Sequence, residues 1–217
     1  MTQSKAWDWE VVKNPVWRIP CEESFYYASR WKEKGYSHLL DLGCGLGRHT
    51  VFFTKQGFCI SAMDLSSEAV RSTEAWLKDE AILADVKLGD MLSLPYPDAS
   101  FDCLFSYHVI SHTDTPGAKK IISEIHRVLM PDGEIFLTLC SKDTWSYKDA
   151  GFPVIDENSV LKTDGTEVNV PHFYVNLDDV FVLLEGFEII KVRHVDDCYF
   201  DGKATNSKHY FILARRL

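Results

Sequence analysis

The sequence predicts an α/β fold in which a doubly wound, mainly parallel sheet of seven strands is closed by an antiparallel strand. Apolar segments of strand type alternate five times with segments of helical type, which requires crossover connections and therefore parallel neighbours. The final two β-rich segments, 187–192 and 208–213, have no helix between them and are predicted to close the sheet as an antiparallel pair.

Composition and charge narrow the class of protein. The 217 residues are 46% hydrophobic and 25% charged, as expected for one globular domain over 1–217 that buries roughly 70% of its extended surface. A formal net charge of −9, without a run of basic residues, argues against nucleic acid as a partner. Six scattered cysteines without a C-x-x-C pair indicate a reducing compartment, and no signal segment or membrane-length apolar run is evident. We therefore expect a cytoplasmic protein with no membrane partner; its oligomeric state stays open.

The elements can be placed by their stop and cap residues. Gly35 and Gly57 end the first two helices, Ser66 caps the third, and Pro116 starts the fourth in its first turn. The expected order is an aromatic arm 1–20, helix 24–34, strand 38–41, helix 48–56, strand 58–63, helix 66–80, strands 85–88 and 101–106, helix 115–130 and strand 134–139.

The alternation stops for about thirty residues after Cys140, which is too long for a structureless connection inside a compact domain. Asp164-Gly165 lies between two strand-like arms and predicts a hairpin over 160–168. Asn176 then caps a helix that runs to Glu185. We expect the arm and helix at 1–35 and the insertion at 141–175 to cover the substrate.

Three glycines, Gly43, Gly45 and Gly47, follow the first strand at alternate positions. Without their β-carbons, a ligand can lie directly on the backbone at the start of a helix. The dinucleotide fingerprint places its third glycine one position later, where this chain has Arg48. An NAD-dependent oxidoreductase is therefore an alternative rather than the first interpretation.

Acidic residues stand at or near the ends of three successive strands. Asp41 precedes the glycine turn, and Asp64 ends the second strand, where its carboxylate can accept hydrogen bonds from both hydroxyls of a ribose. Asp90 follows the third strand and would lie beside an adenine, with Leu65 and Met91 as apolar flanks. The pattern predicts a nucleoside site at this edge of the sheet.

Five segments in register resemble class I S-adenosylmethionine-dependent methyltransferases, which have a Rossmann-like sheet. They are L-D-L-G-C-G-L-G-R (40–48), the acid Asp64, G-D-M (89–91), F-D-C-L-F-S (101–106) and R-V-L-M-P-D-G-E-I (127–135). The resemblance spans about 38–140 and implies S-adenosylmethionine as the cofactor. It assigns the following residues to cofactor binding: Asp41, Gly43 and Gly45 at the methionine part, Gly47 in the same turn, Asp64 at the ribose, Leu65, Asp90 and Met91 at the adenine, and Ser106 near the methionine end.

Methyl transfer from a sulfonium is an in-line displacement with a neutral leaving group, so alignment supplies most of the acceleration and a base is optional. His108, just after the strand 101–106, is the candidate base. No metal is predicted, because no third ligand is evident beside His108 and His112. The residues expected to line the acceptor pocket are Tyr26, Tyr27, Trp31, His112, His172 and Tyr174.

Ser106-Tyr107-His108-Val109 lacks the proline-rich turn of amino-nucleobase methyltransferases, and the chain has no Pro-Cys dipeptide for a cytosine-directed nucleophile. The first interpretation is therefore methyl transfer to a small molecule. The alternatives are the NAD-dependent oxidoreductase and a non-catalytic regulatory protein that keeps the cofactor.

Overall fold

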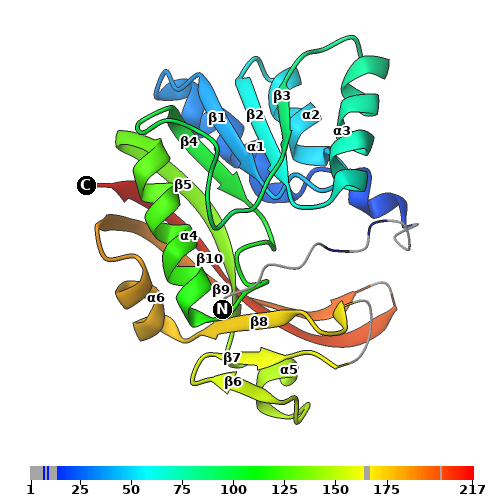
Figure 1. The fold of residues 1–217 in the computed structure, drawn as a ribbon, viewed down its shortest axis with the longest axis vertical. Coiled ribbons are helices and arrows are strands. Elements are labelled where there is room, and N and C mark those ends of the chain that lie inside the picture. Colours follow the sequence, from blue (N-terminus) through cyan, green and yellow to red (C-terminus); the bar gives the residue numbers. More distant parts are fainter. Residues whose placement is uncertain (1–6, 8, 10–13, 164–166, 201) are drawn as a thin grey trace.

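The computed structural model describes residues 7, 9, 14–163, 167–200 and 202–217. Helices lie on both faces of one twisted sheet (Figure 1). The helices are the 3-10 helix η2 (Pro15–Arg18), α1 (Glu22–Glu33), α2 (Arg48–Lys55), α3 (Ser67–Asp79), α4 (Thr115–Val128), α5 (Trp145–Lys148) and α6 (Leu177–Leu183). The strands are β1 (His38–Leu42), β2 (Cys59–Asp64), β3 (Asp85–Leu88), β4 (Phe101–Ser106), β5 (Leu129–Ser141), β6 (Val154–Asp156), β7 (Ser159–Leu161), β8 (Pro171–Val175), β9 (Phe187–Phe200) and β10 (Lys203–Arg216).

The main sheet confirms the predicted fold class. Its strands follow the order β3-β2-β1-β4-β5-β10-β9, and the first five are parallel. β10 lies antiparallel between β5 and β9, so it is the closing antiparallel strand. The strand order reverses at β1, whose two neighbours are β2 and β4. Such a switch point leaves a crevice at the carboxyl ends of the strands, where α/β sheets bind ligands.

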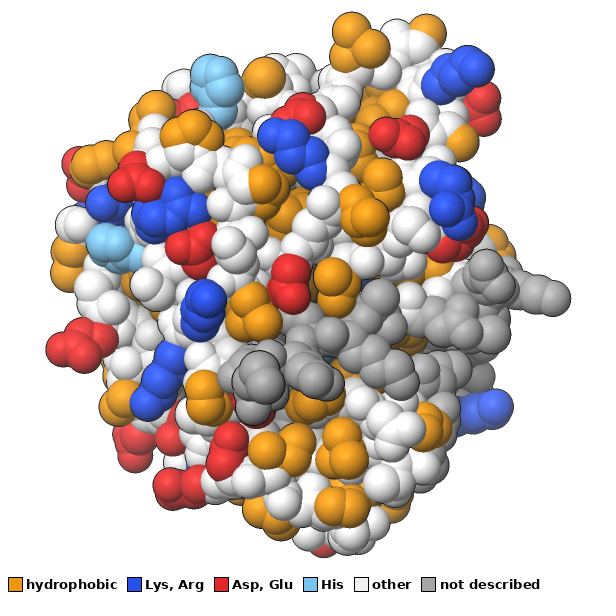
Figure 2. All heavy atoms as spheres, viewed as in Figure 1, with side chains coloured by type: hydrophobic (Ala, Val, Ile, Leu, Met, Phe, Trp, Pro, Cys, Tyr) orange, Lys and Arg blue, Asp and Glu red, His pale blue; other side chains and the backbone are white. Residues whose placement is uncertain are grey.

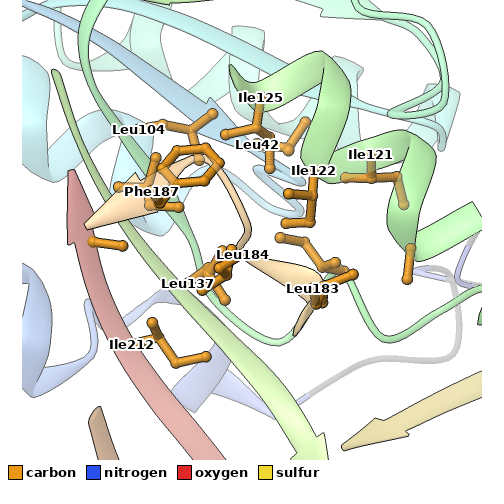
Figure 3. Packing of buried hydrophobic residues seen from close by; sticks show 14 of the residues in the cluster. Leu42, Leu104, Ile121, Ile122, Ile125, Leu137, Leu183, Leu184, Phe187 and Ile212 are labelled. Atoms are coloured by element: carbon orange, nitrogen blue, oxygen red, sulfur yellow. The ribbon is translucent and has the colours of Figure 1, made fainter. Parts of the chain in front are cut away.

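Both faces of the sheet are buried, as the continuous apolar character of the strands predicts. Leu104 and Leu137 point to one face and pack with Ile125 of α4 and Leu183 of α6 (Figure 3). Their sequence neighbours, such as Phe105, point to the opposite face and pack against α1 and α2. The alternation fixes the register of the sheet, and with it the position of each strand's carboxyl end.

The insertion after β5 differs from the predicted hairpin. Residues 164–166 lie outside the described part, and the strand pair is β7 with β8, displaced from 160–168. The longer loop between them is closed by backbone bonds in which Lys162 N donates to Val170 O and Asn169 N to Lys162 O. β6 adds to the other side of β7, and β8 continues the main sheet by pairing with the end of β5. The insertion therefore builds a wall beside the carboxyl ends of the strands (Figure 1).

The closing hairpin is longer than the sequence predicts, since β9 and β10 each have 14 residues. Their outer halves pair only with each other and carry mostly exposed side chains, so no apolar pattern marks them. On the face shown in Figure 2, acidic and basic side chains are interspersed. Within the described residues, no helix combines the length and apolar character that crossing a membrane requires.

Candidate active site

A cavity of about 370 Å³ opens at the carboxyl ends of the central strands, beside the switch point. Four parts of the chain contribute to its walls: the glycine turn with the ends of β2 and β3, the loop after β4, the N-terminal arm and the insertion. The lining includes Trp7, Trp9, Trp17, Gly43, Gly45, Asp64, Leu65, Asp90, Met91, Tyr107, His108, His112, Thr138, Cys140, Lys162, Glu167, His172 and His209.

The glycine turn leaves no room for side chains. The backbone N–H groups of Gly43 and Cys44 both donate to Met63 O, at 2.8 and 3.0 Å, which ties the turn to β2. A β-carbon on Gly43 would lie 2.3 Å from the Val109 side chain, and one on Gly45 would lie 2.7 Å from the Trp9 ring. Both glycines also have positive φ angles, +77° and +54°. The turn is thus a bare backbone cradle of the kind on which a flat cofactor can lie.

Asp64 stands where the sequence predicts the ribose contact. Its Oδ2 accepts a hydrogen bond from Gly45 N, and its Oδ1 accepts one from Ser66 N, both at 2.9 Å. Each carboxylate oxygen keeps a second lone pair for a ligand hydroxyl. Burial raises the pKa of Asp64, while the two backbone donors oppose that rise. Since Asp64 also lines the cavity, these features fit the nucleoside part of S-adenosylmethionine.

The residues predicted to contact the adenine lie on the same wall of the cavity. Leu65, Asp90 and Met91 all line the cavity, and Asp90 Oδ1 accepts a hydrogen bond from Leu92 N at 2.9 Å. Gly89 N donates to Asp64 O at 3.0 Å, which links the end of β3 to the end of β2. The structure therefore brings the predicted ribose and adenine residues to one wall.

Three predicted cofactor residues lie beneath this wall and are not among the residues that line the cavity. Asp41 is buried, and its Oδ2 accepts a 2.6 Å hydrogen bond from the Thr50 hydroxyl. Burial raises the pKa of Asp41 to about 7. Gly47 precedes α2 with φ +91°, and the Ser106 hydroxyl donates to Leu42 O at 3.1 Å. These residues hold the strand ends and helix α2 that carry the turn.

His108 lies in the cavity, as predicted for a base. Its φ of +58° is unusual for a residue with a side chain, and its backbone N–H donates to Thr138 Oγ1 at 2.7 Å. The imidazole Nδ1 lies 3.3 Å from the same hydroxyl, and the ring centroid lies 4.3 Å from that of His209. Burial lowers the pKa of His108 well below its ordinary value, and it lowers the pKa of His209 to about 4. Both rings are therefore neutral at neutral pH and available as proton acceptors.

A second cluster joins the loop after β4 to the insertion. His112 Nε2 and His172 Nε2 each lie 3.3 Å from Glu167 Oε1, and Lys162 pairs with the other carboxylate oxygen. Burial opposes ionisation of Glu167, but the hydrogen bonds from both histidines lower the pKa of this carboxyl well below its usual range. The cluster therefore holds an ionised carboxylate between two imidazoles and one ammonium group at the wall of the cavity.

The aromatic residues predicted to line an acceptor pocket separate into two groups. His112 and His172 line the cavity, but Tyr26, Tyr27, Trp31 and Tyr174 are not among its lining residues. Tyr26 is 53% exposed at the surface of α1. One turn of α1 brings Tyr27 and Trp31 onto the face that packs against the sheet, where Tyr27 stacks on Phe136 with centroids 4.3 Å apart.

Tyr174 is also buried, and its hydroxyl forms a hydrogen bond with the Ser146 hydroxyl at 3.0 Å.

Four residues that line the cavity were not predicted from the sequence: Trp7, Trp9, Glu167 and His209. Three tryptophans in a short arm are the signal that could have indicated two of them. The indole N–H groups of Trp7 and Trp9 are buried and have no hydrogen-bond partner within the described part of the chain. Buried donors without a partner are uncommon in folded proteins.

Comparisons with known proteins agree with this geometry. A family model described as a methyltransferase domain matches residues 40–137. The chain is 33% identical over 182 residues to a malonyl-[acyl-carrier protein] O-methyltransferase from Serratia marcescens, covering 74% of this chain and 68% of that protein. It is 31% identical over 121 residues to norajmaline N-methyltransferase from Rauvolfia serpentina, covering 54% of this chain and 41% of that protein.

Among solved structures, a SAM-dependent methyltransferase from Methanosarcina mazei superposes with a TM-score of 0.71 and 25% identity, covering 83% of this chain and 92% of that one. The chain belongs to the class I S-adenosylmethionine-dependent methyltransferase family, whose cofactor fits the cradle and the Asp64 carboxylate described above. It spans only 25% to 58% of the length of several other curated relatives that it matches.

Proposed function

We propose that this protein transfers a methyl group from S-adenosylmethionine to a small-molecule acceptor held in the cavity. The observation that carries the proposal is the continuity of one cavity, which includes both the glycine turn with Asp64 and the half-buried imidazole of His108. Membership of the methyltransferase family favours this function over the NAD-dependent alternative. The neutral, half-buried imidazoles of His108 and His209 in the same cavity favour it over a protein that only binds the cofactor.

When bound, S-adenosylmethionine supplies an electrophilic methyl group whose sulfur leaves as a neutral thioether. The residues of this chain have to align the acceptor, exclude water and remove its proton where it has one. The Trp9 ring packs against Gly45 of the turn and lies 5.9 Å from the Trp7 ring, and we propose that these two indoles exclude water. His108 is the proposed base, and the Thr138 hydroxyl 3.3 Å from Nδ1 orients its ring.

The acceptor half of the cavity is built by the segments that carry no family motif. Trp7, Trp9 and Trp17 come from the predicted cover at 1–35, and Lys162 and Glu167 come from the insertion at 141–175. One relative is named for norajmaline and another for malonyl-[acyl-carrier protein], so acceptor chemistry differs among relatives. The net charge of −9 supports a small acceptor rather than nucleic acid. We also propose that the protein acts in the cytoplasm.

The test is transfer of label from methyl-labelled S-adenosylmethionine. The purified protein is incubated with a cell extract separated into low-mass, protein, and nucleic-acid fractions, and label is followed in each. We expect label in the low-mass fraction, with S-adenosylhomocysteine formed in equal amount. Label confined to protein or nucleic acid would reject a small acceptor, and failure of the protein to bind S-adenosylhomocysteine in calorimetry would reject the cofactor.

The role of His108 is tested with the acceptor found in that experiment. Replacement by glutamine removes the proton acceptor at similar size, and we expect kcat to fall about 10²–10⁴-fold, the range for a lost general base. His38→Gln is the matched control, because the His38 side chain is 55% exposed and lies at the opposite end of β1. A His108→Gln variant with the activity of the His38→Gln variant would show that the acceptor needs no base.

A further inference from the structure

We propose that His112, Glu167 and His172 hold a divalent metal ion, for which Zn²⁺ has the best fit, with one coordination position open to the cavity. His112 comes from the loop after β4, Glu167 from the loop between β7 and β8, and His172 from β8 itself. Their nearest ligand atoms all lie within 4.8 Å of one another. Two nitrogens and one carboxylate oxygen are a common ligand set for catalytic zinc.

The distances fit a tetrahedral ion. Zinc bonds to imidazole nitrogen and carboxylate oxygen are about 2.0–2.2 Å long, so two ligand atoms of a tetrahedral site lie about 3.3–3.5 Å apart. Glu167 Oε1 lies 3.3 Å from His112 Nε2 and 3.3 Å from His172 Nε2. An octahedral site with bonds of that length would bring neighbouring ligands closer, to about 3.0 Å. The two imidazole nitrogens lie within 4.8 Å of each other, and the partly exposed His112 ring can adjust to bring them to the tetrahedral distance.

The hydrogen bonds around the cluster aim its lone pairs at one point. His172 Nδ1 lies 3.1 Å from Val170 O, and since a carbonyl only accepts, Nδ1 carries the proton and Nε2 has the lone pair. In the singly protonated ring that lone pair faces the carboxylate oxygen of Glu167, and a metal ion between the two atoms would take the place of the proton that otherwise bridges them. A backbone carbonyl that fixes the tautomer of an imidazole is a typical outer partner of a metal ligand.

Lys162 completes the arrangement. It binds Oε2 of Glu167, which leaves Oε1 as the single oxygen directed at the two imidazoles. The proposed site has three protein ligands, and all of them line the same cavity as His108. Its fourth position is therefore accessible to an oxygen, nitrogen or sulfur atom of a bound acceptor, as in catalytic rather than structural zinc sites. This proposal departs from the sequence prediction of no metal, because the third ligand lies more than fifty residues from His112 in the chain.

Metal binding is tested without the cofactor, so the outcome is independent of the proposed methyl transfer. The full chain carries Cys59→Ser and Cys198→Ser, because both thiols are exposed and would bind zinc themselves. After chelator treatment, ZnCl₂ is titrated by calorimetry, and bound zinc is measured by elemental analysis. We expect one zinc per chain and a higher melting temperature with zinc. Co²⁺ in the same site should give the intense visible absorption of tetrahedral rather than octahedral cobalt.

Two single variants decide the location of the ion. Glu167→Gln and His112→Ala should each weaken zinc binding at least tenfold, while His38→Ala, which removes an exposed histidine, should leave it unchanged. Circular dichroism establishes that each variant is folded. His112 is partly exposed, so His112→Ala is the variant less expected to disturb the fold. The proposal is overturned if the parent chain binds no zinc, which would indicate that protonated histidines form an ion pair with Glu167. It is also overturned if both variants bind zinc as tightly as the parent does.

Discussion

Replacing the buried Asp41 by asparagine should stabilise the protein above pH 7 and leave it unchanged in acid. Asparagine keeps a carbonyl oxygen for the Thr50 hydroxyl, which donates to Asp41 Oδ2 at 2.6 Å. It removes the charge that the folded chain has to accommodate at a side chain with almost no exposure. The variant therefore isolates the free-energy cost of ionising this carboxyl.

The magnitude follows from the two pKa values. Burial raises the pKa of Asp41 from its ordinary 3.8 to about 7. Because the folded pKa is the higher one, the protonated carboxyl's contribution to stability is complete below pH 3.8 and is lost as the pH rises through about 7. Each pKa unit corresponds to about 1.4 kcal/mol, so the wild-type chain loses about 4 kcal/mol over this range. The asparagine variant does not titrate and does not incur this loss.

The assay is urea unfolding followed by tryptophan fluorescence, at intervals from pH 4 to pH 8, for wild type and Asp41→Asn. We expect the difference in unfolding free energy to be near zero at pH 4 and to reach about 2–4 kcal/mol in favour of the variant at pH 8. Asp85→Asn is the control, because the Asp85 side chain is 52% exposed. A difference between wild type and Asp41→Asn that stays constant across the pH range would refute the reasoning.

Three further changes test the site and its support. Asp64→Asn should raise the dissociation constant of S-adenosylhomocysteine about 10–100-fold in calorimetry, the effect of losing a charged acceptor, and an unchanged constant would contradict the ribose contact. Glu134→Ala should lower the unfolding free energy, measured in urea, by about 1–3 kcal/mol. The fully buried carboxylate accepts hydrogen bonds from the Trp31 indole at 3.0 Å and from Arg30 at 2.8 Å. An unchanged urea midpoint would show that neither hydrogen bond contributes to stability. His209→Gln should reduce the stability that the protein loses on acidification. Folding lowers the pKa of His209 from 6.5 to about 4, so its contribution to stability is complete above pH 6.5 and falls by about 1.4 kcal/mol per pH unit as the pH drops toward 4. Equal acid sensitivity of variant and wild type between pH 7 and pH 4.5 would argue against the last prediction.

The topology and the cofactor wall could be predicted from the sequence because local patterns specify both. β1, β2 and β4 are short runs of mostly apolar residues, and the parallel strands β1–β5 all have their carboxyl ends at the same edge of the sheet. An acid placed at the end of such a run, such as Asp64 or Asp90, is thereby brought next to the glycine turn whatever the rest of the chain does. The prediction needed no knowledge of side-chain packing.

The part of the cavity that we propose for the acceptor could not be predicted in this way, because it depends on tertiary contacts. The face of α1 that carries Tyr27 packs against the sheet, and nothing in its spacing distinguishes a pocket from a core. Glu167 reaches the cavity through a loop whose length the Asp-Gly signal did not fix. His209 comes from the middle of β10, and only the pairing of β10 with β5 places it near His108.

The position of β10 also has a consequence for the order in which the chain assembles. β9 precedes β10 in the sequence, yet among the described strands it pairs only with β10, which occupies the place beside β5. A nascent chain that has exposed β9 but not β10 therefore has a strand without a partner, while β5 keeps an open edge. During synthesis the five parallel strands can form early, whereas His209 enters the cavity only when the final hairpin docks. Folding and completion of the site should therefore coincide in that last step.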